Sequence, residues 1–175
     1  MPARISVSDL IKVNALDPGV TTGYASGIIE DGSMGVISGQ AVWNELQLYR
    51  NLQSSRPDII VYERFEYRST NAYSKSQLSD VELFPRNLIG IINLYAQKAA
   101  SLNLLHETGK VVKLYPQLPA YALGKNAYFT DQKLKAAKVY KVASPHANDA
   151  MRHLLQWWQF GPGFEFNTSG FEPLA

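Results

Sequence analysis

Short apolar runs, separated by turn residues, predict that the first part of the chain folds as three strands. Residues 11–16 (IKVNAL) have the composition of a buried strand, which leads directly into Asp17 and an Asp-Pro-Gly turn. A second strand is predicted over 22–29 and, after turn residues at 30–33, a third over about 36–43. The pattern therefore predicts an antiparallel meander at the start of the fold.

The next segments differ from one another in their hydrophobic period. Residues 45–55 have the spacing of a short helix, whereas IIVYE at 59–63 is rich in β-branched residues, as in a central strand buried on both faces. Residues 64–79 are polar and irregular, which predicts a loop or the start of the following helix. A stripe of apolar residues then predicts a long helix over 82–102.

The remaining segments complete an α/β order. KVVKL at 110–114 predicts a fifth strand, and a short lysine-bearing helix is expected near 131–141. A last helix is expected to begin with Ser144 as N-cap and Pro145 in its first turn, and to end near Phe160. The order β-β-β-α-β-α-β-α predicts an α/β fold in which helices cover a five-stranded mixed sheet.

Composition limits the class of protein. A chain of 175 residues, 46% of them apolar, suits one domain with its own core, which we assign to 1–160, with 161–175 as a C-terminal loop or tail. The sequence has no cysteine, which excludes disulfides, thiol nucleophiles and cysteine-based zinc sites. No apolar run approaches the roughly 18 residues of a membrane span, so a soluble, cytoplasmic protein is expected.

The formal net charge of +2 is unevenly distributed. Residues 101–145 carry seven lysines against Glu107 and Asp131, so the rest of the chain is slightly acidic. Charge alone leaves two interpretations open, a solvated helix face or a surface for nucleic-acid phosphates. The choice depends on whether the acidic residues form a site.

Two carboxylates are predicted at the ends of separate strands. Asp17 follows the first strand, and Glu63 ends the central strand, where a charged group needs a partner. Each also has a purely structural explanation, because Asp17 is a good turn former and Glu63 could pair with Arg64 or Arg68.

A third group of polar residues lies at the start of the last helix. His146 and Asp149 are three residues apart and so share a helix face, although a solvated helix end would also explain them. If this helix packs across the sheet, Asp149 joins Asp17 and Glu63 in an oxygen-rich cluster. Such a cluster suits Mg²⁺ or Mn²⁺ better than Zn²⁺.

These residues resemble the motifs of a known family. DPGVTTGYASG (17–27), VYERF (61–65) and HANDAMRHLLQ (146–156) are similar to the three motifs of the RuvC family of Holliday junction resolvases, in the RNase H-like superfamily, including its shorter phage relatives. The resemblance covers roughly residues 11–160. Sugar kinases and actin-like ATPases share the first motif, but they need a far longer chain.

The resemblance implies an RNase H-like fold and a nuclease active site. By carry-over, Asp17, Glu63 and Asp149 would be metal-ligating carboxylates, and His146 the fourth member, as a ligand or a proton shuttle. Two Mg²⁺ or Mn²⁺ ions per site would then support phosphodiester hydrolysis by water. Glu66 could replace Glu63 if the strand ended later.

The resemblance also implies branched DNA, above all four-way junctions, as the partner. The candidate DNA contacts are basic and aromatic residues of the 64–79 loop and of the lysine-rich segment: Arg64, Phe65, Arg68, Lys75, Lys125, Lys133, Lys135, Lys138 and Lys141. Phe65, Tyr67 and Tyr73 are also candidates for stacking on opened bases.

The family acts as a homodimer, since two strands must be cut symmetrically. We expect the interface on the long helix around Leu88–Tyr95, where Gly90 would permit close approach. Two alternatives to a junction resolvase remain: a broader nuclease for flaps, forks or RNA-containing substrates, and a catalytically silent DNA-binding module. A phage-encoded member would act in the host cytoplasm.

Overall fold

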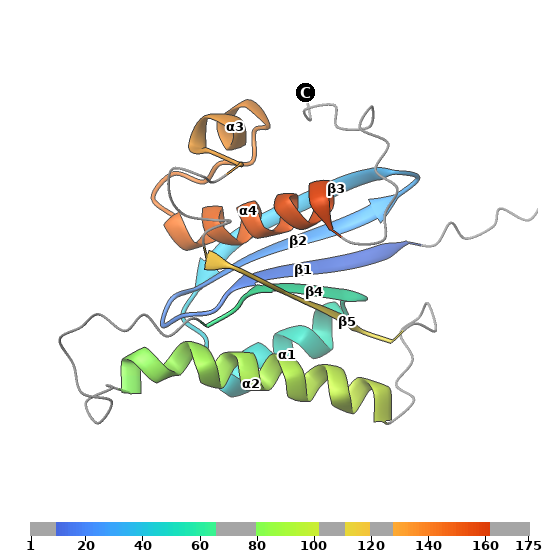
Figure 1. The fold of residues 1–175 in the computed structure, drawn as a ribbon, viewed down its shortest axis with the longest axis vertical. Helices are drawn as coiled ribbons and strands as arrows, with labels where there is room; N and C mark the ends of the chain where they lie inside the picture. Colours follow the sequence, from blue (N-terminus) through green and yellow to red (C-terminus); the bar gives the residue numbers. More distant parts are fainter. Residues whose placement is uncertain (1–9, 66–79, 102–110, 120–127, 162–175) are drawn as a thin grey trace, which may run out of the picture.

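The computed structural model describes residues 10–65, 80–101, 111–119 and 128–161. A five-stranded sheet with strand order β3-β2-β1-β4-β5 forms its centre, and helices lie on both faces (Figure 1). In chain order, the elements are β1 (Ile11–Asp17), β2 (Thr22–Glu30), β3 (Ser33–Ala41), α1 (Glu45–Ser55), β4 (Ile59–Glu63), α2 (Asp80–Ser101), β5 (Lys113–Gln117), α3 (Asp131–Ala136) and α4 (Pro145–Phe160). The predicted α/β class and mixed five-stranded sheet are confirmed.

The sheet is antiparallel on one side of β1 and parallel on the other. β1 pairs antiparallel with β2, so that Asp17 lies opposite Gly23, and it pairs parallel with β4. β2 and β3 are antiparallel, whereas β4 and β5 are parallel. Because parallel strands end at the same edge of a sheet, Asp17 at the end of β1 and Glu63 at the end of β4 are brought to one edge.

The period-2 alternation of the strands decides which helix these carboxylates face. On β1, Val13 and Ala15 belong to the core layer under α4, whereas Leu16 belongs to the layer with α1 and α2. Two residues beyond Ala15, Asp17 falls on the α4 face. β4 alternates in the same way, which places Glu63 on that face too.

Two strands differ by more than one residue from their predicted bounds. The Asp31-Gly32 turn has positive φ at both residues, 49° and 78°, so β3 pairs with β2 from Ser33 onward, three residues earlier than expected. β5 runs from Lys113 to Gln117, three residues later than the predicted 110–114, and includes Pro116. Proline is tolerated there because β5 is an edge strand.

The helices match their predicted bounds to within two residues, except at the end of α3. α1 has the predicted bounds and a capping box between Asn44 and Gln47. α3 stops at Ala136 rather than near 141, because Lys138 has φ 57°, in the left-handed region. α4 begins at Pro145 as expected, but Ser144 makes no side-chain hydrogen bond as its cap.

The apolar stripe of α2 packs inside the chain's own core. Leu88 and Ile92 are fully buried and Tyr95 is 7% exposed, in the layer shared with α1 and the sheet. These three residues are therefore unavailable for the dimer contact predicted around Leu88–Tyr95, and that prediction was wrong for them. Gly90 and Leu94 stay exposed on the outer side of α2. Among the described helices, α2 included, none combines the length and apolar character of a membrane span.

Candidate metal centre

The first turn of α4 lies unusually close to β2. A Cβ atom on Gly23 would lie 1.9 Å from the carbonyl oxygen of His146, so only glycine fits there. Ala147 and Ala150 are also fully buried, which keeps α4 near the sheet. Because Gly23 is the register partner of Asp17, this approach places His146 beside Asp17.

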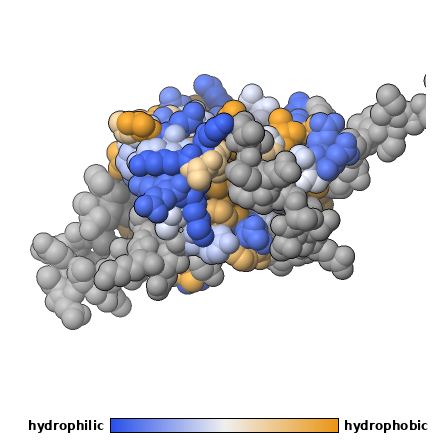
Figure 2. Space-filling view, turned by 90° about the horizontal axis from the view of Figure 1, so that it is seen from above, coloured by the Kyte–Doolittle hydropathy of each residue, from blue (hydrophilic) through white to orange (hydrophobic). Residues whose placement is uncertain are grey.

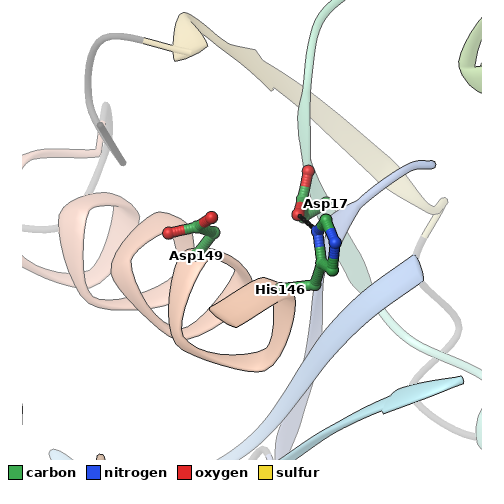
Figure 3. A group of neighbouring side chains, drawn as sticks. All are labelled: Asp17, His146 and Asp149. Carbon is green, nitrogen blue, oxygen red and sulfur yellow. Dashed lines mark hydrogen bonds and ion pairs between the residues drawn. The ribbon is translucent and has the colours of Figure 1, made fainter. Parts of the chain in front are cut away.

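Asp17, His146 and Asp149 form one compact group (Figure 3). One potential ligand atom from each residue lies within 4.8 Å of the others. Nδ1 of His146 and Oδ2 of Asp17 are 2.8 Å apart, and an ionised carboxylate only accepts, so His146 donates this hydrogen bond. The fold thus brings together three of the four residues that the sequence predicted as catalytic.

Glu63, the fourth, lies next to this group and contacts a different residue. Oε2 of Glu63 is 3.1 Å from Nε2 of His153 on α4. Nδ1 of His153 is 2.8 Å from Oε1 of Gln117 at the end of β5. Sequence reasoning gave His153 and Gln117 no role in the site. One signal was available, because His153 is four residues after Asp149 and so lies on the same helix face.

The carboxylates repel one another in a partly desolvated site. The pKa of Asp17 is raised to about 6, chiefly by burial and also by the charges of Glu63 and Asp149, against the lowering effect of the His146 hydrogen bond. Burial also raises the pKa of Asp149, which the neighbouring Arg152 guanidinium partly offsets. The site therefore carries negative charge that the described side chains compensate incompletely.

Arg152 links this site to α3. Its guanidinium pairs with Asp149 and with Asp131, the first residue of α3, and Nε donates to the carbonyl oxygen of Phe129 at 3.0 Å. The side chains of Arg152 and Asp149 are 11% and 13% exposed, so their contact is largely shielded from water, whereas Asp131 is 50% exposed. Arg152 is three residues after Asp149 and so shares its helix face, but this bridge was not predicted from the sequence.

The group fits a hard divalent cation. Two carboxylates and one imidazole converge within 4.8 Å, and no cysteine exists in the chain to favour a softer metal. A bound cation would also offset the burial, and the smaller carboxylate repulsion, that raise the pKa values of Asp17 and Asp149. Asp17, Asp149 and His146 are thus the residues that would hold Mg²⁺ or Mn²⁺, with Glu63 beside them.

The lysines predicted to contact DNA are exposed on and after α3. Lys133, Lys135, Lys138 and Lys141 all face solvent. The ammonium of Lys133 lies 3.5 Å from the ring centre of Tyr128, and that of Lys135 lies 4.8 Å from the ring centre of Tyr140. Figure 2, which looks down on the side of α3 and α4, shows hydrophilic residues gathered over α3.

The remaining predicted contacts lie around the end of β4 or outside the described residues. Arg64 is exposed and Phe65 half-buried, directly after β4. The backbone N–H of Arg64 donates to the carbonyl oxygen of Gln117 at 2.8 Å. The other predicted DNA contacts lie outside the described residues: Arg68, Lys75, Lys125, Tyr67 and Tyr73. Glu66, the predicted alternative to Glu63, and residues 162–175 of the predicted tail also lie outside them.

Comparison with known proteins identifies the fold. No family model matches the sequence, and no curated protein matches it. Among solved structures, Thermus thermophilus RuvC in complex with a Holliday junction substrate matches with a TM-score of 0.50 and 16% identity, over 86% of this chain and 96% of that one. The chain has a RuvC-like, RNase H-like fold. A second T. thermophilus RuvC structure matches with a TM-score of 0.48 and 15% identity, over 86% of this chain and 97% of that one.

Proposed function

We propose that the protein is a metal-dependent endonuclease that hydrolyses phosphodiester bonds in branched DNA, with four-way junctions as its main substrate. The observation that carries the proposal is the convergence of Asp17, His146 and Asp149, with Glu63 adjacent, at the carboxyl ends of β1 and β4. In open α/β sheets this edge is where ligands bind. The RuvC-like fold supports the proposal, since the matched RuvC structure contains a Holliday junction.

The proposed roles follow from the chemistry of each side chain. Asp17, Asp149 and Glu63 would supply oxygen ligands to two divalent ions, Mg²⁺ or Mn²⁺. When bound, two such ions lower the pKa of a water and stabilise charge on the leaving oxygen. The carboxylates come from two strands and one packed helix, so they are fixed relative to one another before substrate binds.

His146 has two possible roles that the hydrogen bond to Asp17 helps to define. With Nδ1 donating to Asp17, the second ring nitrogen, Nε2, is an acceptor in the neutral imidazole. In this state His146 can either ligate a cation or take a proton from the attacking water through Nε2. Side-chain exposure of 43% leaves the ring accessible to either partner.

The DNA backbone would pass over the lysine-bearing side of α3. Arg152 ties α3 to Asp149, so a strand that enters the metal centre would pass near Lys133 and Lys135. Contacts between these lysines and phosphates would not depend on the DNA sequence, as expected for a nuclease that selects a DNA shape. Lys138, Lys141 and Arg64 are further proposed phosphate contacts, and Phe65 a proposed base contact.

The deciding experiment is cleavage of synthetic four-way junctions, flaps, forks and linear duplex with Mg²⁺ or Mn²⁺. Asp17→Asn and Asp149→Asn are expected to lower the rate of junction cleavage by at least a hundredfold, because each removes a charged ligand. The matched control is Asp31→Asn, which removes a carboxylate from the exposed β2–β3 turn, at a positive φ that asparagine also tolerates.

Three outcomes would change the proposed function. Unchanged cleavage by both site variants would remove Asp17 and Asp149 from the active site. Faster cleavage of flaps or forks than of junctions would assign the broader nuclease. Junction binding without cleavage in either metal would assign the catalytically silent module.

We also propose that the protein acts as a homodimer, with the outer side of α2, including Gly90 and Leu94, in the contact. Leu94 is 50% exposed, and a Cβ on Gly90 would meet no atom within 4 Å, so these two described positions are open to a partner. Sedimentation of the full chain with and without a junction measures the stoichiometry. One protein chain per junction at saturation would contradict the proposal.

A further inference from the structure

His153 is a fully buried side chain that links the ends of two parallel strands to α4. It is 0% exposed, and both of its ring nitrogens make hydrogen bonds. The partners are Glu63 at the end of β4 and Gln117 at the end of β5, which are register neighbours in the sheet. One imidazole on α4 therefore contacts adjacent positions of two strands at the edge that carries the metal centre.

The chemistry of the partners fixes the direction of the bond to Glu63. An ionised carboxylate can only accept, so Nε2 of His153 must carry the hydrogen and donate it to Oε2 of Glu63. Gln117 faces Nδ1 with its amide oxygen here, and after a half-turn its NH₂ group would face the same atom. Gln117 can therefore pair with an imidazole that carries hydrogen on both nitrogens or on Nε2 alone, and Nε2 donates to Glu63 in both forms.

We infer that His153 is a positioning residue, which holds Glu63 by one carboxylate oxygen and leaves the other oxygen for a divalent cation. The inference rests on the proposed function and assigns the group that orients its fourth site residue. Glu63 needs such a group because it ends a strand and its side chain is 22% exposed. The charge of Glu63 raises the pKa values of both Asp17 and Asp149, so the position of its carboxylate affects the whole cluster.

A hydrogen bond from His153 to Glu63 would raise metal affinity, because it restricts the Glu63 side chain before the metal binds. A glutamate has three rotatable side-chain bonds, and ordering such a chain costs free energy. Partners that orient a metal ligand typically contribute about 10- to 100-fold to metal affinity. His153 is well suited to this task, since its own ring is held by Gln117 and by complete burial.

Two amide substitutions separate the contacts of His153. In His153→Gln the side-chain nitrogen can occupy the place of Nε2 and still donate to Glu63. In His153→Asn the nitrogen can occupy the place of Nδ1, and the bond to Glu63 is lost. Both variants are polar and smaller than histidine, so their general effects on the core are similar, and comparing their melting temperatures checks this.

The measurement is Mn²⁺ binding to the DNA-free protein by titration calorimetry, followed by junction cleavage. We expect His153→Gln to stay within about threefold of wild-type Mn²⁺ affinity and His153→Asn to lose about tenfold or more. The loss of cleavage by His153→Asn should appear in kcat, with junction affinity unchanged. Equal losses in the two variants, or no loss in either, would overturn the inference and leave His153 as a packing residue.

A second readout keeps this test separate from the proposed function. In NMR spectra of the metal-free protein, the His153 Nε2–H signal is expected to shift in Glu63→Gln, because that change weakens the acceptor. An unshifted signal would overturn the inference. If the signal shifts but Mn²⁺ affinity is insensitive to both Asp17→Asn and Asp149→Asn, the proposed metal centre fails while the contact itself stands.

Discussion

Asp17 shows how the fold prepares a carboxylate for a cation. Its side chain is 14% exposed, and desolvation is the largest cause of its raised pKa, ahead of the two neighbouring carboxylates. Ionised Asp17 is therefore less stable in the metal-free folded protein than in the unfolded chain. A divalent cation would reverse that penalty, which couples metal binding to the stability of the fold.

The pH dependence of stability follows from this shift. The pKa of Asp17 rises from 3.8 to about 6 on folding, so its contribution to stability is full below pH 3.8 and is lost as pH rises through about 6. At about pH 7.5, Asp17→Asn should stabilise the metal-free protein by on the order of 1–3 kcal/mol, less the lost hydrogen bond to His146. Thermal unfolding in EDTA at about pH 5 and about pH 7.5 measures the difference.

The same experiment has an internal control. Asp31→Asn, in the exposed β2–β3 turn, should leave the pH dependence of the melting temperature close to that of wild type. With Mg²⁺ or Mn²⁺ in excess, wild type should gain stability and Asp17→Asn should not. A destabilised Asp17→Asn at about pH 7.5 without metal would contradict the raised pKa.

At the scale of single residues, the sequence predicted the positions of the acidic residues better than it predicted their hydrogen-bond partners. The sequence pattern predicted Asp17 and Glu63 at the ends of strands, and the structure adds that both lie on the α4 face of the sheet. The partner of Glu63 depends on which turn of α4 crosses the end of β4, a tertiary contact that no local pattern encodes. The alternative ion pair with Arg64 or Arg68 was suggested by proximity in the sequence, and Arg68 lies outside the described residues. The hydrogen bond that the structure gives Glu63, to His153, was not predicted.

α4 is the element on which the candidate site most depends. It contacts β1, β2, β3 and β4 and supplies His146, Asp149 and His153. Its position over the sheet depends on small residues, above all on Gly23 under the first turn. A change in this packing moves three site residues at once.

Gly23→Ala tests that dependence. The added Cβ would lie 1.9 Å from the His146 carbonyl oxygen, so α4 must shift outward, at a cost of about 1–3 kcal/mol. We expect a lower melting temperature, together with loss of Mn²⁺ binding, because His146 moves away from Asp17. Gly35→Ala is the matched control on β3, since a Cβ there meets no atom within 4 Å. Equal effects of the two substitutions would contradict the close approach.

Predictions of elements failed where tertiary context or backbone conformation overrides local preference. The predicted fifth strand ended at Leu114, before Pro116, but an edge position removes most of the cost of the missing proline N–H. α3 has helix-forming residues beyond Ala136, yet Lys138 adopts a left-handed conformation and the chain turns toward α4. Both cases depend on where the segment lies in the fold, which hydrophobic periodicity does not report.

At the scale of the whole molecule, the lysines proposed to contact DNA and the carboxylates of the metal centre lie in the same layer. Lys133 and Lys135 of α3 and the carboxylates of the metal centre all lie on the α4 side of the sheet, with Arg152 between them. A net charge of +2 conceals this arrangement, because the two sets largely cancel in the sum. A DNA phosphate bound near these carboxylates would therefore lie close to Lys133 and Lys135.

Salt dependence measures the contribution of those lysines. Replacing Lys133 and Lys135 together by glutamine should weaken junction binding in EDTA. It should also reduce the slope of log affinity against log salt by roughly two, one counterion per lost phosphate contact. Lys98→Gln on α2, on the opposite face of the sheet, should leave the slope unchanged. An unchanged slope in the double variant would remove α3 from the DNA path.

The two edges of the sheet differ in what they offer a further strand. Pro116 lies in β5, and a proline presents no N–H to an incoming chain, so this edge is a poor template for strand addition. β3 forms the other edge with nine residues and no proline, and its Ile37 is 69% exposed. Within the described sheet, self-association by strand pairing would therefore start at β3, and Ile37→Lys is the substitution that should suppress aggregation without touching the metal centre.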